Sequence, residues 1–122
     1  APSAVVRLKN MGASSSSLAT SLRAIIAQRL VRRSCELCKK TSSSKSIGCS
    51  HCHGSGFRGR VGIFEILVLD ESLRHHLHHA TSLEDWTSLA RQHCTKSLRD
   101  DGIMKVEAGL TTIEEIFKAT SA

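Results

Sequence analysis

Two Cys-x-x-Cys units constrain this 122-residue chain more than any other feature. Each unit presents two thiolates from one tight turn, and two units together complete the four tetrahedral positions that zinc prefers. The ten residues between the units, KKTSSSKSIG, are polar and typical of a connecting loop. The sequence therefore predicts a closed structural zinc site, with no coordination position left for water, whose ligands are Cys35, Cys38, Cys49 and Cys52.

Two other arrangements of these side chains stay open at this point. His51 or His53 can replace one thiolate, because zinc is also held by three cysteines and one histidine. A redox-active disulfide is the remaining hypothesis, but it requires an exposed thiol of low pKa in a thioredoxin-like setting, which the sequence does not indicate. Thiols kept for a metal indicate a reducing compartment. The fifth cysteine, Cys94, is interpreted as a small buried residue of a predicted helix.

Composition and charge narrow the classes of partner. Hydrophobic residues make up 40% of the chain, enough for a modest core, but aromatic residues are only 3%, which argues against a stacking platform for single-stranded nucleic acid. Residues 23–60 carry nine Lys or Arg against one acid, whereas residues 61–122 carry ten acids and six bases. The basic middle suits nucleic acid, anionic lipid or an acidic protein partner, and a merely solvated surface is the alternative. The sequence contains no export signal and no apolar run long enough to span a membrane.

The periodicity of apolar residues predicts a largely helical chain with one clear strand. We expect helices over 4–11 and 15–29, followed by a short extended LVRR segment. The stretch RVGIFEILVLD is apolar on both alternating faces, so we expect a strand covered on both sides within a larger sheet. Further helices follow residue 70, and their expected caps are Asp70, Ser82 with Asp85, Asp100 or Asp101, and Thr111 with Glu114 or Thr112 with Glu115.

Four histidines lie in the first of these later helices, at positions 75, 76, 78 and 79. His75 and His79 are one turn apart on one helical face, which raises the hypothesis of a second metal site. The sequence fixes no carboxylate beside them, so a solvated polar surface is the favoured interpretation. The chain also lacks the phosphate-binding and hydrolase motifs of common enzymes, and we therefore predict no catalytic residue and no cofactor-binding residue in it.

Three stretches together resemble a known family. They are AQRLVRRSCELC, CSHCHGSGFRGRVGIFEILVLDESLR and KSLRDDGIMKVEAGLTTIEEIF. In this order they are similar to the carboxy-terminal region of the bacterial ATPases that power type II secretion and type IV pilus assembly, with the match running from about residue 3 to residue 118. The cysteines fall on the family's tetracysteine positions, Arg29 to Arg32 on its QRLVR segment, and Gly59, Arg60, Gly62 and Glu65 on its GRxGxxE segment.

The resemblance implies an α+β fold, mostly helical, in four parts. Residues 1–34 would end a RecA-like motor domain, and residues 35–58 would form the tetracysteine zinc subdomain. Residues 59–69 would be a strand returning to the motor sheet, and residues 70–122 a helical carboxy-terminal subdomain. The chain starts without Met inside a predicted helix, and we expect it to be a portion of a longer protein.

The resemblance also implies a function for that longer protein. It would be a hexameric ATPase of a Gram-negative bacterium, cytoplasmic and peripheral on the inner membrane, where it contacts a platform protein of the secretion or pilus machinery. The phosphate-binding loop and acidic boxes would lie upstream of Ala1, so ATP and Mg²⁺ would bind only in the parent, whereas zinc would bind here. Secretion and pilus branches are not distinguished by these residues.

Two functions of other classes compete with this expectation. A free-standing zinc ribbon that binds nucleic acid is supported by the basic middle of the chain, but it lacks aromatic residues and a recognisable groove-reading helix. The stretch CSHCHGSG also fits the cysteine-rich module of heat-shock chaperone cofactors. That module needs several copies of its pattern, and CELCKKTS lacks both glycines, so this hypothesis is the weakest.

Overall fold

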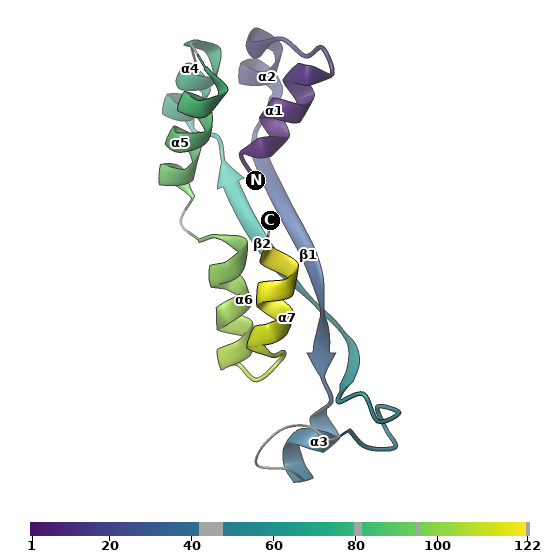
Figure 1. Cartoon of the computed structure of the whole chain (residues 1–122). Coiled ribbons are helices and arrows are strands. Elements are labelled where there is room, and N and C mark those ends of the chain that lie inside the picture. Colours follow the sequence, from purple (N-terminus) through teal and green to yellow (C-terminus); the bar gives the residue numbers. More distant parts are fainter. Residues whose placement is uncertain (42–47, 80–81, 95, 122) are drawn as a thin grey trace. The chain divides into compact units, whose positions relative to one another are not determined.

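The fold is mixed α and β, as the sequence predicts. The computed structural model describes residues 1–41, 48–79, 82–94 and 96–121. These ranges contain seven helices and one two-stranded sheet (Figure 1). The elements, in chain order, are α1 (Ser3–Asn10), α2 (Ser15–Ser21), β1 (Ala24–Ser34), α3 (Glu36–Thr41), β2 (Phe57–Val68), α4 (Glu71–His79), α5 (Leu83–His93), α6 (Leu98–Glu107) and α7 (Ile113–Thr120).

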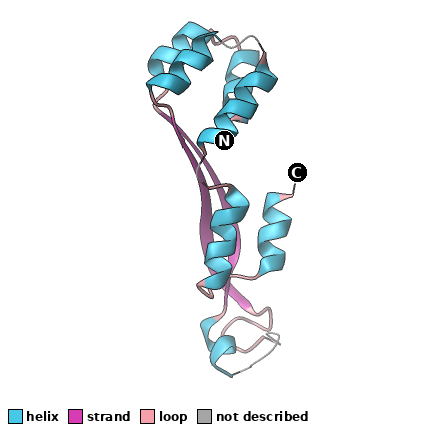
Figure 2. Cartoon of the chain, turned by 90° about the vertical axis from the view of Figure 1, so that its left-hand side faces the viewer, coloured by secondary structure: helices cyan, strands magenta, loops and turns pink. Residues whose placement is uncertain are grey.

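The two strands are antiparallel neighbours (Figure 1 and Figure 2). At one end the Leu69 N–H donates to the Arg23 carbonyl at 2.9 Å, and at the other the Cys35 N–H donates to the Gly56 carbonyl at the same distance. The start of β1 therefore lies beside the end of β2, and the end of β1 beside the start of β2. This pairing brings the first cysteine of the chain next to the turn that carries the second pair.

The chain divides into two compact units, each containing part of both strands. Unit 1 comprises Ala1–Ala27 and Glu65–Ser97, and unit 2 comprises Gln28–Phe64 and Leu98–Ala122. Each unit has buried hydrophobic residues of its own, so each is described separately below.

Unit 1 is built around one large anchor, Trp86. Its side chain is 1% exposed and its indole N–H donates to the Pro2 carbonyl at 3.2 Å, which ties α5 to the start of the chain. Cys94, predicted to be buried, is half-buried against the edge of this core. The buried residues of the core are Val5, Leu18, Ala19, Ile25, Leu67, Leu69, Leu73, Leu77, Trp86 and Ala90.

Unit 2 contains the four cysteines of the two Cys-x-x-Cys pairs and two helices, α6 and α7, that lie side by side (Figure 1). Ile116 of α7 is buried with Val31 and Ile63 of the strands. The helices approach closely at Gly102, where an added Cβ would lie 2.5 Å from Ile116 Cγ2. Asp101, 6% exposed, accepts a hydrogen bond from the Phe64 N–H at 2.9 Å and so connects α6 to β2.

Three of the predicted helix caps are confirmed. Asp70 Oδ1 accepts from the Leu73 N–H at 2.8 Å at the start of α4. Ser82 caps α5 and Thr112 caps α7, each through a side-chain oxygen that accepts a backbone N–H three residues later. The predicted cap at Asp100 or Asp101 is wrong, because α6 begins at Leu98 and contains both residues. Asp101 accepts a hydrogen bond from the Phe64 N–H of β2.

The helix predicted over residues 15–29 is also wrong in its second half. Helix α2 ends at Ser21, Leu22 is extended, and residues 24–34 form β1. In a strand successive side chains point to opposite faces, so Ile25 is buried whereas Ile26 is exposed. The same spacing of apolar residues also fits a helix, and the pairing of β1 with β2 decided between the two. The predicted LVRR segment is part of β1.

The strand predicted over residues 60–70 is confirmed as β2, which begins earlier, at Phe57. Its expected covering on both faces is not seen in the described ranges. Ile63 and Leu67 are fully buried on one face, whereas Phe64 and Ile66 of the other face are 39% and 50% exposed. Helix α3 occupies the start of the predicted connecting loop, and residues 42–47 of that loop lie outside the described residues.

Candidate metal centre

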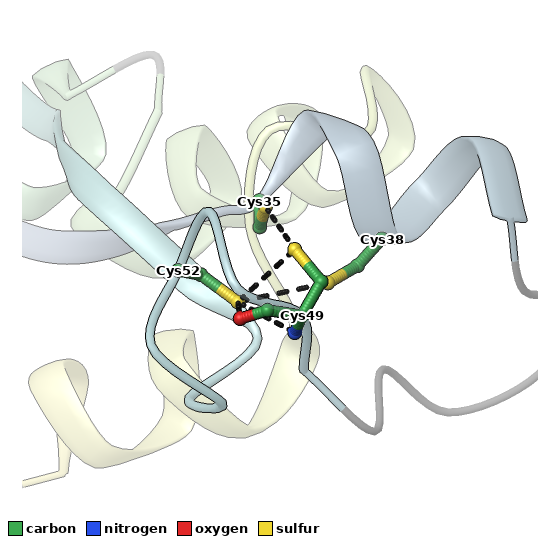
Figure 3. A group of neighbouring side chains, drawn as sticks. All are labelled: Cys35, Cys38, Cys49 and Cys52. Carbon is green, nitrogen blue, oxygen red and sulfur yellow. Dashed lines mark hydrogen bonds between the residues drawn. The ribbon is translucent and has the colours of Figure 1, made fainter.

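All four predicted ligands lie together in unit 2 (Figure 3). Cys35 directly follows β1, and Cys38 is the third residue of α3. Cys49 and Cys52 belong to the turn that precedes β2. Antiparallel pairing of the two strands thus brings together two chain segments that are separated by the connecting loop.

The distances between the sulfur atoms suit a tetrahedral metal. The Sγ–Sγ distances are 3.7 Å for Cys35 and Cys49, 3.6 Å for Cys38 and Cys52, and 3.7 Å for Cys49 and Cys52. All four sulfurs lie within 4.8 Å of one another. Four sulfurs at about 2.3 Å from a central zinc ion are separated by about 3.8 Å, so the group can hold the ion with little movement.

Backbone groups around Cys52 favour its thiolate. The N–H groups of Cys49 and Gly56 each donate to Cys52 Sγ at 3.2 Å. Burial by itself raises the pKa of the Cys52 thiol, but these two bonds, with those from the neighbouring thiols of Cys38 and Cys49, lower it to about 6. Burial raises the pKa of the Cys38 thiol to about 12, with further contributions from its hydrogen bonds to the other three cysteines. Clustered thiols oppose one another's ionisation, and a divalent metal held by this group would supply the compensating charge.

The turn around Cys49 and Cys52 depends on close backbone approach. Gly48 has φ +74°, and a Cβ added there would overlap the backbone of Gly54. The Gly54 N–H donates to the Cys49 carbonyl at 2.8 Å, which closes the turn. Glycine at position 48 is therefore required both by its conformation and by the space beside it.

The two histidines of the turn are not part of the sulfur group. His51 is exposed, and both its ring Nδ1 and its carbonyl contact Arg58 Nη1, at 3.2 and 2.7 Å. His53 is exposed with φ +55°. Within residues 1–41, 48–79, 82–94 and 96–121, the four cysteines are the only set of three or more His, Cys, Asp or Glu that is close enough to hold a metal. This geometry supports four sulfurs rather than three sulfurs and one imidazole.

The strand that leads into the site is held by the carboxy-terminal helices of the same unit. Arg32 donates from Nε and Nη2 to Glu115 Oε1, at 3.1 and 2.7 Å, and its backbone N–H donates to Glu115 Oε2. The Thr111 hydroxyl donates to the Arg32 carbonyl at 2.8 Å, and the Ser34 N–H donates to the Leu110 carbonyl. Sequence reasoning missed this clamp, because nothing local links residues that are 83 positions apart.

The predicted histidine pair lies elsewhere. His75 and His79 are exposed on α4 in unit 1, with ring centroids 4.5 Å apart. The cysteine group and the histidine pair are thus separate features of the chain. None of the helices in the described ranges is long and apolar enough to cross a lipid bilayer.

Comparison with known proteins gives a family match over almost the whole chain. The sequence profile described as "Type II/IV secretion system protein" matches residues 1–118. The chain is 38% identical over 122 residues to the type II secretion system protein HxcR of Pseudomonas aeruginosa, an alignment that covers 98% of this chain and 26% of that protein.

Two further relatives come from the secretion and pilus branches. The chain is 35% identical over 136 residues to the type II secretion system protein E of Pseudomonas aeruginosa, covering 96% of this chain and 27% of that protein. It is 33% identical over 141 residues to the type IV pilus assembly ATPase PilB of Thermus thermophilus, covering 98% of this chain and 16% of that protein. The chain therefore spans about a quarter or less of the length of these relatives.

Proposed function

Because the chain belongs to the type II/IV secretion system protein family, we propose that it is the carboxy-terminal portion of a hexameric ATPase that powers type II secretion or type IV pilus assembly. The observation that carries this proposal is the family match over residues 1–118. It is supported by relatives whose alignments cover 96% or more of this chain. One of these relatives is named as a pilus assembly ATPase. Binding of ATP and Mg²⁺ and hydrolysis of ATP belong, in this proposal, to the part of the parent upstream of Ala1.

We assign a separate role to each of the four parts that the family resemblance implies. Residues 1–34 end a RecA-like motor domain, residues 35–58 form the zinc subdomain, residues 59–69 return to the motor sheet, and residues 70–122 form the helical subdomain. Exposed apolar side chains of β2 support the proposal that residues 59–69 return to a larger motor sheet. Phe64, Ile66 and Val68 of β2 are all more than a third exposed, and a strand face of this kind is normally covered within a larger sheet.

Zinc has a structural role in this proposal. Cys35, Cys38, Cys49 and Cys52 supply four thiolates, which fill the tetrahedral shell and leave no open position for a substrate or water. The bound ion would supply the positive charge that lets the clustered thiols ionise and would fix the turn before β2 against α3. In this proposal the chain has a structural role and contacts partner proteins, whereas ATP is hydrolysed by another part of the parent protein.

The basic residues of unit 2 are the proposed docking surface for an inner-membrane platform protein on the cytoplasmic side. Arg29 of β1 and Arg58 and Arg60 of β2 are exposed. Arginines on the strands suit an acidic protein segment, since guanidinium groups bind carboxylates in a bidentate geometry. Coupling of ATP hydrolysis to the membrane machinery would pass through this contact.

The experiment uses the full-length parent protein. We expect it to hydrolyse ATP, and we expect Cys35→Ser or Cys49→Ser to remove bound zinc and abolish secretion or pilus assembly in cells. Cys94→Ser is the matched control, because Cys94 lies outside the sulfur group. A parent that neither hydrolyses ATP nor supports either process would contradict the proposed function.

A second experiment addresses the docking surface. Arg29→Glu with Arg60→Glu should weaken binding of the parent to the cytoplasmic segments of the platform protein, while Arg7→Glu with Arg91→Glu, exposed residues of unit 1, should not. Equal binding by the unchanged parent and both double variants would exclude the arginines as the contact. A salt-dependent affinity for DNA or RNA that the first pair of changes removes would instead favour the nucleic-acid function.

A further inference from the structure

Helix α4 concentrates histidine to an unusual degree. Four of its nine residues are histidines, out of seven in the whole chain, and all four side chains are exposed. We propose that His75 and His79 form a bidentate binding site for a divalent transition metal ion, distinct from the cysteine group. The family match and the proposed ATPase function do not depend on this site.

The two imidazoles already lie in contact. Their ring centroids are 4.5 Å apart, with an angle of 54° between the ring planes. Two imidazole nitrogens on one metal, each at about 2.0–2.1 Å from it, are separated by roughly 3 Å. Residues four apart on a helix have neighbouring Cβ atoms, so rotation about the side-chain bonds brings the nitrogens to this separation without movement of the backbone.

The helix that carries them is firmly held. Leu73 and Leu77 are fully buried in the core of unit 1, and Asp70 caps the first turn. Because α4 buries these leucines, His75 and His79 project from its solvent-facing side, where a hydrated ion has free access. A ligand pair on a rigid element binds more tightly than one on a mobile loop, since less freedom is lost on binding.

Within the part of the chain that the structure describes, no hydrogen bond or ion pair competes for the two imidazoles. Among the described residues, their interactions are ring contacts, at 6.0 Å between His75 and His76 and at 4.7 Å between His78 and His79. His79 is the last residue of α4, where the exposed carbonyl ends of the helix favour a positive charge. Both features favour a bound cation at this end of the helix.

The ligand type indicates the class of metal. Imidazole suits copper, nickel and zinc, whereas the soft thiolates of the cysteine group select zinc. Two protein ligands leave the remaining positions to water, so the site would exchange its ion readily. Nickel is the practical probe, because thiolates already occupied by zinc are protected from it and it does not oxidise thiols as copper does.

The test titrates Ni²⁺ into the untagged, zinc-loaded chain and follows binding by calorimetry and by paramagnetic broadening of the histidine ring signals in NMR spectra. We expect one saturable Ni²⁺ per chain, with the signals of His75 and His79 broadened first. His75→Ala or His79→Ala should each weaken binding by at least about tenfold, because the second imidazole binds at a high effective concentration. The double variant should bind Ni²⁺ no more tightly than either single variant, because both ligands of the pair are then absent.

The matched controls are His76→Ala and His78→Ala, which remove exposed histidines from the same helix. We expect both to keep most of the affinity, and circular dichroism should show the same fold in all variants. Equal losses from all four single substitutions would mean scattered, independent histidines and would overturn the proposal. Absence of saturable binding, or release of zinc in step with nickel uptake, would overturn it as well.

Discussion

Cys52 receives backbone hydrogen bonds on its sulfur from both sides, from Cys49 before it and Gly56 after it. The spacing of the cysteines predicted that this residue is a ligand, but it contained no information on which thiol ionises most easily. That property depends on the directions of two N–H groups, which the fold of the turn sets. Residue identity was thus predictable from the sequence, whereas the electrostatics of the site required the structure.

Gly48 and Gly54 offer a matched pair of substitutions at the sulfur group. Both have positive φ, but a Cβ at Gly48 overlaps the backbone of Gly54, whereas a Cβ at Gly54 meets nothing within 4 Å. We expect Gly54→Ala to cost about 1–2 kcal/mol of conformational strain. Gly48→Ala should add a steric clash and reduce zinc content far more strongly. Zinc content by mass spectrometry of the native protein measures the difference, and equal effects would contradict the steric argument.

Glu115 provides a pH-dependent contribution to the stability of unit 2. The hydrogen bond from Arg32 holds the pKa of the Glu115 carboxyl below its ordinary value of 4.5. A carboxyl whose pKa is lowered by folding adds stability above its unfolded pKa, and this stability is lost as the pH falls through the lowered, folded pKa. We therefore expect Glu115→Gln to be less stable than the wild type at pH 7, with the difference shrinking as the pH falls below the ordinary value of 4.5 and disappearing below the lowered pKa of the folded state.

Urea unfolding of both proteins between pH 7 and pH 3 measures this difference. Release of zinc at acid pH affects the wild type and the variant alike, so the difference between them isolates the carboxyl. Glu114→Gln is the control, since Glu114 is exposed and forms none of the ion pairs found in the described ranges. A stability difference that persists unchanged at pH 3 would mean that Glu115 acts through packing rather than charge.

The elements of the chain were predicted unevenly, for a physical reason. Helices α4, α5 and α7 start at local capping residues, and a cap needs only a few neighbouring residues to form. Strand β1 has no such local mark, because its alternating burial depends on a partner strand more than twenty residues further along the chain. The apolar spacing of residues 15–29 was therefore compatible with a helix until the pairing with β2 was known.

Packing of α6 against α7 is testable at Gly102. A methyl group there would lie 2.5 and 2.8 Å from Ile116 Cγ2 and Cδ1, so we expect Gly102→Ala to destabilise unit 2 by about 1–3 kcal/mol. Ile116→Ala, which removes these atoms, should itself cost about 2–5 kcal/mol. Combined, the two substitutions should cost clearly less than the sum of their separate effects, because the new methyl group fills the vacated space. If the changes in the free energy of unfolding are additive, the methyl group at position 102 does not compete with the Ile116 side chain for space.

At the scale of the whole molecule, the chain has separate sources of stability. Among the described residues, the core of unit 1 contains ten buried residues including Trp86, whereas the hydrophobic cluster at the metal centre consists of the four cysteines. Chelation of zinc should therefore unfold the described residues around the cysteines, 35–41 and 48–56, since in small modules zinc binding contributes roughly 10–16 kcal/mol to folding. The Trp86 core has no metal ligand among its buried residues and should remain folded.

Hydrogen exchange with and without chelator follows both regions in one experiment. We expect amides of the described residues from Cys49 to Gly56 to lose protection when zinc is removed, and amides of α4 and α5 to keep it, because their core is apolar and self-contained. Addition of zinc should restore the original pattern. Simultaneous loss of protection in both units would show that the metal stabilises the entire chain. Unchanged protection around Cys49 would mean that the sulfur group folds without a metal, and the structural role proposed for zinc would then fail.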